Sequence, residues 1–361
     1  PMLAAIVMAA QLVASATAGK TTYVVGGWLP QDSASISRTL APIFQDYLSD
    51  RVGSKMDPPV KFVFKPVDQD SDTSSRSLIE SGGLDMLYSV AGSVACKAAQ
   101  FSWVPLATQQ NILGSSVTGS DALVVFSLLN NSAITRVEDL KGGKLGCGYL
   151  YSGATYYEGF QMLLDHGVHM YRDLAQVRFY GADYDAYFRA VLRGDLDAGF
   201  VSASWLSRND YDEEGLLRVH DRQDALAYEG DRFPASASRL TPSSGLAVSQ
   251  DVPWQLKRQV LQALEDINAS LPSMRALKLA GWTSAANYGA TFTALEHSGI
   301  VYQSNHSKMC RDPFDREDIW RSITCPHGYY LVDYNTSARQ CDLAGLPCPP
   351  GVICFCRPCV P

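Results

Sequence analysis

The chain has 361 residues, 46% hydrophobic and 19% charged, which is enough apolar material for a core of ordinary size. At roughly 100–200 residues per domain, this length predicts two domains or lobes and one small additional module. The formal net charge is −7, and the lysines and arginines are scattered rather than clustered. This pattern argues against a nucleic-acid partner.

The N-terminal stretch 2–18 is apolar and ends in the tripeptide Ala16-Thr17-Ala18. This pattern is typical of a secretory signal peptide, and we assign residues 1–18 to one. A membrane anchor is the alternative, although about 17 apolar residues is the lower limit for a span. The signal peptide places the rest of the chain outside the cell, either secreted or on the extracellular side of the membrane.

Nine cysteines agree with export, because seven of them lie close together in a C-terminal segment rich in Asn, Gly, Pro and Tyr. These seven are Cys310, Cys325, Cys341, Cys348, Cys354, Cys356 and Cys359. Such density predicts a disulfide-bonded module, and a zinc site fits the spacing less well because paired C-x-x-C knuckles are missing. Four N-x-S/T sequons, at Asn130, Asn268, Asn305 and Asn335, are consistent with a secreted glycoprotein.

The segment after the leader alternates between predicted strands and helices. The predicted strands are residues 21–25, 61–67 and 84–88. The first predicted helix begins at Ser33 or Ser35, the second covers 74–81, and the third follows the loop 89–93. Pro42 lies inside the first helical pattern and should kink or split it. This β-α-β-α-β order predicts a parallel or mostly parallel sheet with helices on its faces.

A second series of elements follows and then leads back to the first. We interpret the apolar strand 122–129 as a crossing out of lobe one. In lobe two, predicted helices that begin at Tyr156 and cover 184–193 alternate with strands 144–147, 177–180 and 198–202. Strand 244–249 then returns to lobe one and is followed by helices 253–268 and 274–279. The sequence therefore predicts a hinged α/β clamshell. Its parts are residues 19–121 (lobe one), 122–240 (crossing strand and lobe two), 241–303 (return to lobe one) and 304–361 (Cys-rich tail).

The loop from Tyr151 to Thr155 connects a predicted strand to a predicted helix. A Ser/Gly/Thr loop at a helix start presents free backbone N–H groups, hydroxyls and the positive end of the helix dipole. The loop is therefore a predicted anion site. Ligands of open α/β sheets bind at the carboxyl ends of the strands, which are here the loops at Trp28, Ser89 and Ser152.

Three stretches occur in an order and spacing that resemble a known family. They are VEDLKGGKLGCGYLYSGATYYEGFQMLL, RAVLRGDLDAG and SSGLAVSQDVP. Over about residues 20–300 the chain resembles the phosphonate-binding-protein-like branch of the type-2 periplasmic binding proteins. The resemblance is to versions that serve as extracytoplasmic sensor domains, such as those of tetrathionate-type sensor kinases. It implies a non-enzymatic, two-lobed domain that needs no cofactor and closes on a small anionic ligand.

The resemblance also implies which residues bind this ligand. In lobe two they are Ser152, Gly153, Ala154, Thr155 and Tyr156, with hydroxyl contacts from Ser152 and Thr155; in lobe one they are Trp28, Tyr88 and Ser89. A plain helix cap at Ser152 is the alternative there, and packed core aromatics are the alternative for Trp28 and Tyr88.

One pair of residues departs from the family pattern. Asp183 and Tyr184 stand where phosphonate binders carry Ser-His. A carboxylate near the cleft would repel a dianion, so Asp183 either caps the following helix or binds a cationic group of the ligand. The ligand's identity therefore stays open within the class of small oxyanions.

Cys96 and Cys147 lie outside the Cys-rich tail, near the predicted cleft. A disulfide between them would tether the two lobes, whereas two separate buried thiols are the simpler interpretation. The tail resembles the Cys-rich repeats that connect extracellular ligand domains to the membrane in eukaryotic receptors. Its odd number of cysteines, and the end of the chain soon after Cys359, indicate an ectodomain cut before a membrane span and a signalling module.

Two other functional classes remain as alternatives. One is the binding component of an ABC-type phosphonate or oxyanion importer. The other is an enzyme of periplasmic-binding-like fold, which the sequence does not favour. The six histidines show no H-E-x-x-H or similar metal spacing, and no G-x-S-x-G elbow is present. We therefore expect no catalytic site and no bound metal.

Overall fold

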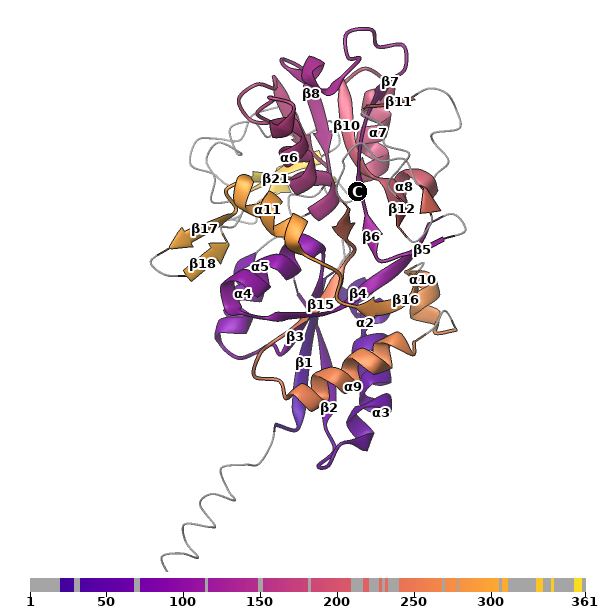
Figure 1. The fold of residues 1–361 in the computed structure, drawn as a ribbon, viewed down its shortest axis with the longest axis vertical. Coiled ribbons are helices and arrows are strands. Elements are labelled where there is room, and N and C mark those ends of the chain that lie inside the picture. The colour runs from indigo at the N-terminus through magenta and orange to yellow at the C-terminus, as the bar shows by residue number, and fades with distance from the viewer. Residues whose placement is uncertain are drawn as a thin grey trace, which may run out of the picture.

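The protein consists of two α/β lobes joined by crossing strands, with a C-terminal segment packed beside the junction (Figure 1). The computed structural model describes residues 20–28, 33–67, 72–113, 116–148, 152–180, 183–208, 217–220, 227–228, 231–232, 240–267, 270–277, 279–304, 307–310, 329–333, 339–340 and 354–358. The predicted signal peptide, three of the four sequons and Cys325, Cys341, Cys348 and Cys359 lie outside these residues. No helix in the described ranges is long and apolar enough to span a membrane.

Lobe one is built on a mixed sheet. Its strands are β1 (Thr22–Gly27), β2 (Lys61–Pro66), β3 (Met86–Ser89), β4 (Val104–Leu113), β15 (Gly245–Val248) and β16 (Leu279–Ser284), in the order β16-β4-β15-β3-β1-β2, with β5 (Ser116–Thr118) on β4. The strands β2, β1 and β3 are parallel as predicted, whereas β15 is antiparallel to both β3 and β4. The predicted mostly parallel sheet is therefore correct for one half only.

Helices cover this sheet on both sides. They are α2 (Ser33–Ala41), α3 (Leu48–Arg51), α4 (Asp72–Glu80), α5 (Ala91–Phe101), α9 (Trp254–Glu265) and α10 (Pro272–Ala276), with the short 3-10 turn η2 (Gly53–Lys55). The helical stretch after Ser33 changes at Pro42 into a π-helical segment, η1 (Pro42–Tyr47). Pro42 has no N–H to donate to the preceding turn, and the predicted kink or split takes the form of a change of helix type without an interruption.

Lobe two is built on a second sheet. Its strands are β7 (Leu123–Leu128), β8 (Lys144–Cys147), β9 (Gln176–Phe179), β10 (Ala198–Ser202) and β11 (Leu217–Val219), in the order β11-β7-β10-β8-β9. Its helical elements are η3 (Val137–Leu140), the π-helical turn η4 (Gly153–Tyr157), α6 (Glu158–Asp165), α7 (Tyr184–Leu192) and α8 (Ala203–Arg208).

The crossing between the lobes differs from the prediction. The apolar segment 122–129 is not the crossing, because β7 is a central strand of lobe two, antiparallel to β10. The described segments that cross are β6 (Ser120–Asp121) and β14 (Thr241–Pro242), which pair antiparallel. Burial of the first five residues of β7 between two sheet neighbours explains why its sequence is almost continuously apolar.

The chain after β16 forms α11 (Gly289–His297) and a hairpin of β17 (Val301–Ser304) and β18 (Ser307–Cys310). Further along, β19 (Tyr329–Asp333) lies between β20 (Arg339–Gln340) and β21 (Cys354–Pro358), and a separate small pair is formed by β12 (Ala227–Tyr228) and β13 (Asp231–Arg232). A disulfide links Cys96 of α5 to Cys310 of β18. Both predicted alternatives for Cys96 are therefore wrong, because Cys96 does not form a disulfide with Cys147 and is not a free thiol.

Cys147 is a fully buried free thiol at the end of β8, and its burial raises its pKa. The arrangement of the backbone explains why Cys96 pairs with Cys310. Helix α5 packs directly against β18, and this contact brings the Cα atoms of the two cysteines to 5.7 Å from each other.

The packing of α6 on β10 depends on a glycine. A Cβ added to Gly159 would overlap the ring of Phe200, which is fully buried and has no room to move. We expect Gly159→Ala to destabilise the protein by about 1–3 kcal/mol, although alanine is the better helix former. Urea unfolding measures this change in the free energy of unfolding. The double variant Gly159→Ala/Phe200→Leu should lose less stability than the sum of the two single variants, because the smaller leucine makes room for the added Cβ. Losses of stability that simply add would contradict the overlap.

The turn before β8 depends on the carboxylate of Asp139. It accepts hydrogen bonds from Thr135 N (3.0 Å), Thr135 Oγ1 (2.7 Å) and Arg136 N (3.1 Å). The Thr135 hydroxyl and the other donors lower the pKa of Asp139 to about 2. Because the folded pKa is depressed, this carboxylate stabilises the fold above its ordinary pKa and loses that contribution as the pH falls through about 2. We expect Asp139→Asn to flatten the dependence of the melting temperature on pH between about 4 and 2. A parallel pH dependence in wild type and variant would contradict this.

Candidate functional site

The carboxyl edges of the two sheets face each other at one point between the lobes. Gly153 follows β8 of lobe two, and Ala91 and Gly92 follow β3 of lobe one. A Cβ placed on Gly153 would lie 3.4 Å from Ala91 Cβ, 3.8 Å from Thr241 Cβ and 3.9 Å from Gly92 N. The starts of η4 and α5 therefore meet directly beside the crossing strand β14, in a closed arrangement of the lobes.

Ser152 is the N-cap of the helix formed by η4 and α6. Its Oγ accepts a hydrogen bond from Thr155 N at 3.1 Å, which satisfies one of the free N–H groups of the first turn. The structure thus shows the predicted N-cap at Ser152, and a ligand contact of the same residue stays a prediction. The capping bond uses Oγ as an acceptor, so the hydroxyl proton is still able to donate to an anion.

Thr155 has the most unusual environment of the predicted site residues. Its side chain is fully buried, yet its Oγ1 has no hydrogen-bond partner among the described residues. An unsatisfied buried hydroxyl costs about 1–3 kcal/mol, so such a group calls for an explanation. A ligand that accepts this hydrogen bond at the helix start would remove that cost.

Two other residues of the loop contribute shape rather than contacts. Ala154 is buried at the same helix start. Tyr156, predicted to touch the ligand, is fully buried in the core of lobe two instead, where its hydroxyl lies 2.6 Å from that of Tyr171 and its ring meets Phe179 edge-on.

Tyr88 of lobe one corresponds to the core alternative, whereas Trp28 belongs to none of the apolar core clusters formed by the described residues. Tyr88 packs against Phe44 and Trp282, with ring centroids 5.3 and 5.6 Å apart, and its hydroxyl donates to Gln109 Oε1. Burial raises the pKa of Tyr88, so it stays a neutral donor. Trp28 is also buried, and its backbone N donates to Tyr88 O at 3.2 Å.

Ser89, the third lobe-one prediction, ends β3 and is buried opposite Gly245 of β15. It lies two residues before Ala91, the residue that meets Gly153. Of the lobe-one predictions, Ser89 is therefore nearest in sequence to the contact between the lobes.

Asp183 is the N-cap of α7, and its Oδ1 accepts a hydrogen bond from Ala186 N at 3.0 Å. The helix-cap alternative is thus confirmed, and the bond satisfies one of the free N–H groups in the first turn of α7. Tyr184 stacks on Trp205 of α8 with ring centroids 5.6 Å apart. Both residues follow β9 at the same edge of the sheet as Ser152.

A hydroxyl cluster at the crossing was not predicted. Ser204 Oγ donates to Asp121 Oδ2 at 2.5 Å, Ser204 N donates to Asp121 Oδ1 at 3.1 Å, and Ser202 Oγ lies 3.2 Å from Ser204 Oγ. Ser202 ends β10, so it occupies the same edge as Ser152 and Asp183. The triplet Ser202-Ala203-Ser204, which begins at the last residue of the predicted strand 198–202, could have indicated this cluster. Ser152 was selected for the same reason, because it follows the carboxyl end of a strand.

The junction brings together several groups that can donate hydrogen bonds. It offers hydroxyls, free N–H groups of helix starts and helix dipoles. Among the described residues no group of three or more His, Cys, Asp or Glu side chains could hold a metal ion.

The two sheets, the double crossing and the paired helix starts define a two-lobed type-2 periplasmic binding protein. A family model described as "ABC transporter, phosphonate, periplasmic substrate-binding protein" matches residues 27–288, and the chain belongs to this family. Members of the family are periplasmic solute-binding proteins by this description. A search of curated proteins finds no match.

Solved structures agree with the fold. XAC2383 from Xanthomonas citri bound to chloride ion is 14% identical, with a TM-score of 0.56 over 77% of this chain and 100% of that chain. PhnD1 from Prochlorococcus marinus (MIT 9301) in complex with methylphosphonate is 13% identical, with a TM-score of 0.53 over 77% of this chain and 98% of that chain. Identities this low show a shared fold and leave the ligand to be argued from the site.

Proposed function

We propose that this protein is an extracellular sensor domain that closes on a small oxyanion held at the helix start Ser152–Thr155. The observation that carries the proposal is the buried hydroxyl of Thr155, which lacks a partner within the described ranges and lies at the positive end of a helix dipole. Ser152 Oγ and the free N–H groups of the first turn supply further donors. Family membership supports the ligand class, because the matched model describes binders of phosphonates.

Closure supplies the signal in this proposal. The contact between Gly153 and the start of α5 exists only when the lobes are together, so a ligand that contacts both helix starts stabilises the closed state. The closed population then rises with the ligand's differential affinity for that state.

A thermal-shift screen tests the ligand class. Methylphosphonate, phosphate, sulfate and tetrathionate would be compared with arginine, because Asp183 lies near the same edge. At a concentration 100 times its Kd a ligand stabilises the folded state by about 2.7 kcal/mol, a shift of several °C. Ser152→Ala should reduce the shift. Stabilisation by arginine and by none of the anions would overturn the proposal, and so would anion shifts that Ser152→Ala leaves unchanged.

A receptor and an importer component remain two uses of such a domain. The Cys-rich segment after Cys310 supports a receptor stalk linked to a membrane span and a signalling module, whereas the family description favours an importer. Membrane fractionation of the full-length protein expressed from its own gene separates them. A receptor stays in the membrane after a carbonate wash, whereas a free importer component is released.

A further inference from the structure

The segment from Ala285 to Cys310, which includes α11 and the β17–β18 hairpin, lies across the junction of the two lobes (Figure 1). We call it the strap. Its helix α11 contacts α5 of lobe one and also α6 and η4 of lobe two. Leu295 and Ile300 of the strap belong to one continuous apolar cluster that contains Val94 of lobe one and Phe160 of lobe two.

The strap is fixed to lobe one at both ends. At its start, Ala285 N donates to Leu106 O at 3.2 Å and Ala286 N donates to Thr108 Oγ1 at 3.0 Å. At its end, the disulfide joins Cys310 to Cys96, and both cysteines are buried.

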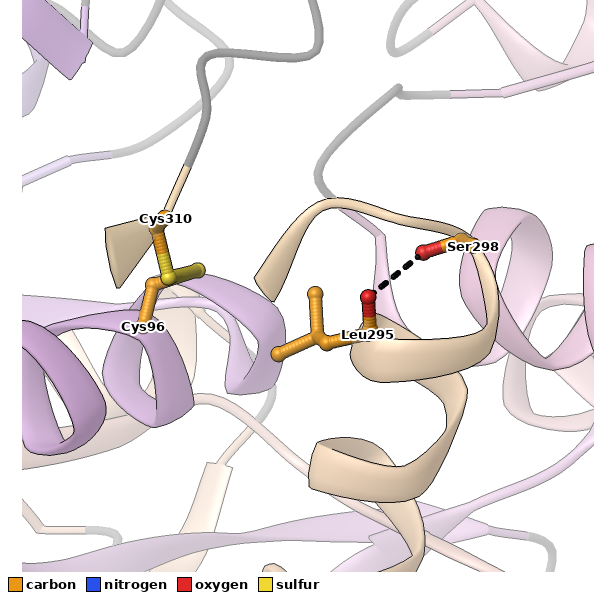
Figure 2. The surroundings of a disulfide bond; sticks show 4 residues. All are labelled: Cys96, Leu295, Ser298 and Cys310. Atoms are coloured by element: carbon orange, nitrogen blue, oxygen red, sulfur yellow. Dashed lines mark hydrogen bonds between the residues drawn. A yellow bond between two sulfur atoms is a disulfide. The ribbon is translucent and has the colours of Figure 1, made fainter. Parts of the chain in front are cut away.

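The disulfide lies close to the end of α11. Figure 2 shows the linked cysteines beside the last turn of the helix, with the Leu295 side chain directed towards α5. That turn is closed by a hydrogen bond from Ser298 Oγ to Leu295 O at 3.0 Å. The disulfide therefore joins the hairpin that follows α11 to α5, beside the part of α11 that is farthest from its anchor at Ala285.

The contacts with lobe two are not covalent. His297 Nδ1 is hydrogen-bonded to Gln161 Oε1 of α6, and Gln161 is itself buried and donates to Asp165 at 2.6 Å. When the lobes separate, the strap must stay with lobe one and break its contacts with α6 and η4. The strap thus presents a prepared surface to which lobe two returns.

We propose that this disulfide-fixed strap sets the balance between open and closed lobes, by holding α11 in the position that α6 and η4 require. A preorganised surface loses less conformational entropy when the second lobe docks on it. Because α5 carries both Cys96 and the helix start at the cleft, the strap also holds the lobe-one half of the ligand site. This last consequence rests on the proposed oxyanion site, whereas the control of closure does not.

Two variants test the strap without any ligand. Cys96→Ala/Cys310→Ala releases the end of the strap, and His297→Ala removes a lobe-two contact while leaving the disulfide in place. Hydrogen exchange of α6 and η4 should become about threefold faster or more in both variants, while that of β2 and α9 stays unchanged. Small-angle scattering should show a larger radius of gyration for both.

The outcomes separate this inference from the proposed function. Faster exchange confined to α5, β17 and β18, with an unchanged radius of gyration, would contradict the control of closure by the strap. The disulfide would then stabilise only the segments that it joins. If the double cysteine variant fails to fold, His297→Ala decides the question by the same two readouts. Methylphosphonate titration should give about 3- to 10-fold weaker binding in the variants. Absence of binding in the wild type would contradict the oxyanion site and leave the exchange result standing.

Discussion

Thr155→Val is expected to weaken oxyanion binding by about 10- to 100-fold while leaving the protein at least as stable as the wild type. Valine keeps the shape of threonine and removes a hydroxyl that is buried without a partner among the described residues. The free protein therefore loses an unsatisfied group, whereas the complex loses a hydrogen bond to a charged ligand. Opposite signs for stability and affinity are difficult to obtain from a general packing defect.

Calorimetric titration with methylphosphonate or phosphate measures the affinity, and urea unfolding measures the stability. Thr291→Val is the matched control, because Thr291 of α11 has a second fully buried hydroxyl without a partner in the described ranges. It should match Thr155→Val in stability and keep wild-type affinity. Equal losses of affinity in the two variants would show that the binding site is not at the start of η4.

Gly153→Leu is expected to hold the lobes apart and to weaken oxyanion binding by about 100-fold or more. A Cβ at Gly153 would make ordinary contacts with Ala91 and Thr241, but the further atoms of leucine would extend into α5 or β14. The ligand would then be held by one lobe. Loss of two hydrogen bonds of about 1.5–3 kcal/mol each corresponds to a factor of at least about 100.

Gly153→Ala is the control for Gly153→Leu, because the Cβ of alanine fits at 3.4 Å from Ala91 Cβ. Alanine should leave both the affinity and the radius of gyration close to wild type, while leucine should increase the radius. A leucine variant that binds like the wild type would show that closure at this contact is not needed for binding.

The local sequence predicted much of this architecture because its signals are local. Period-2 and helical patterns placed β2, β10 and α9 within a few residues, and Pro42 marked a real change of helix type. The strand β4 was missed because Gln109, Gln110 and Asn111 interrupt its apolar pattern. Gln109 and Gln110 are half-buried, whereas Asn111 is buried and its Nδ2 donates to Ser243 Oγ at 2.9 Å.

The sequence predicted the positions of helix starts correctly but did not predict the directions of side chains. Ser152 and Thr155 lie at the junction because any strand–loop–helix unit places its loop at the carboxyl edge of the sheet. Tyr156 and Tyr88 were expected at the ligand, and both point into cores. Whether an aromatic side chain faces a cleft or a core depends on which surface its neighbours leave free, and this is not written in the local sequence.

The sequence by itself determined the two α/β lobes, the return of the chain to lobe one and the helix start at residues 152–155, where we propose that an anion binds. Only the tertiary structure decided that Cys96 pairs with Cys310, 214 residues away, and that α11 joins the two lobes. Nine cysteines allow many pairings, and their spacing carries no information about which of them approach within about 7 Å. That proximity arises from the packing of β18 against α5, a contact between distant segments that no local pattern encodes.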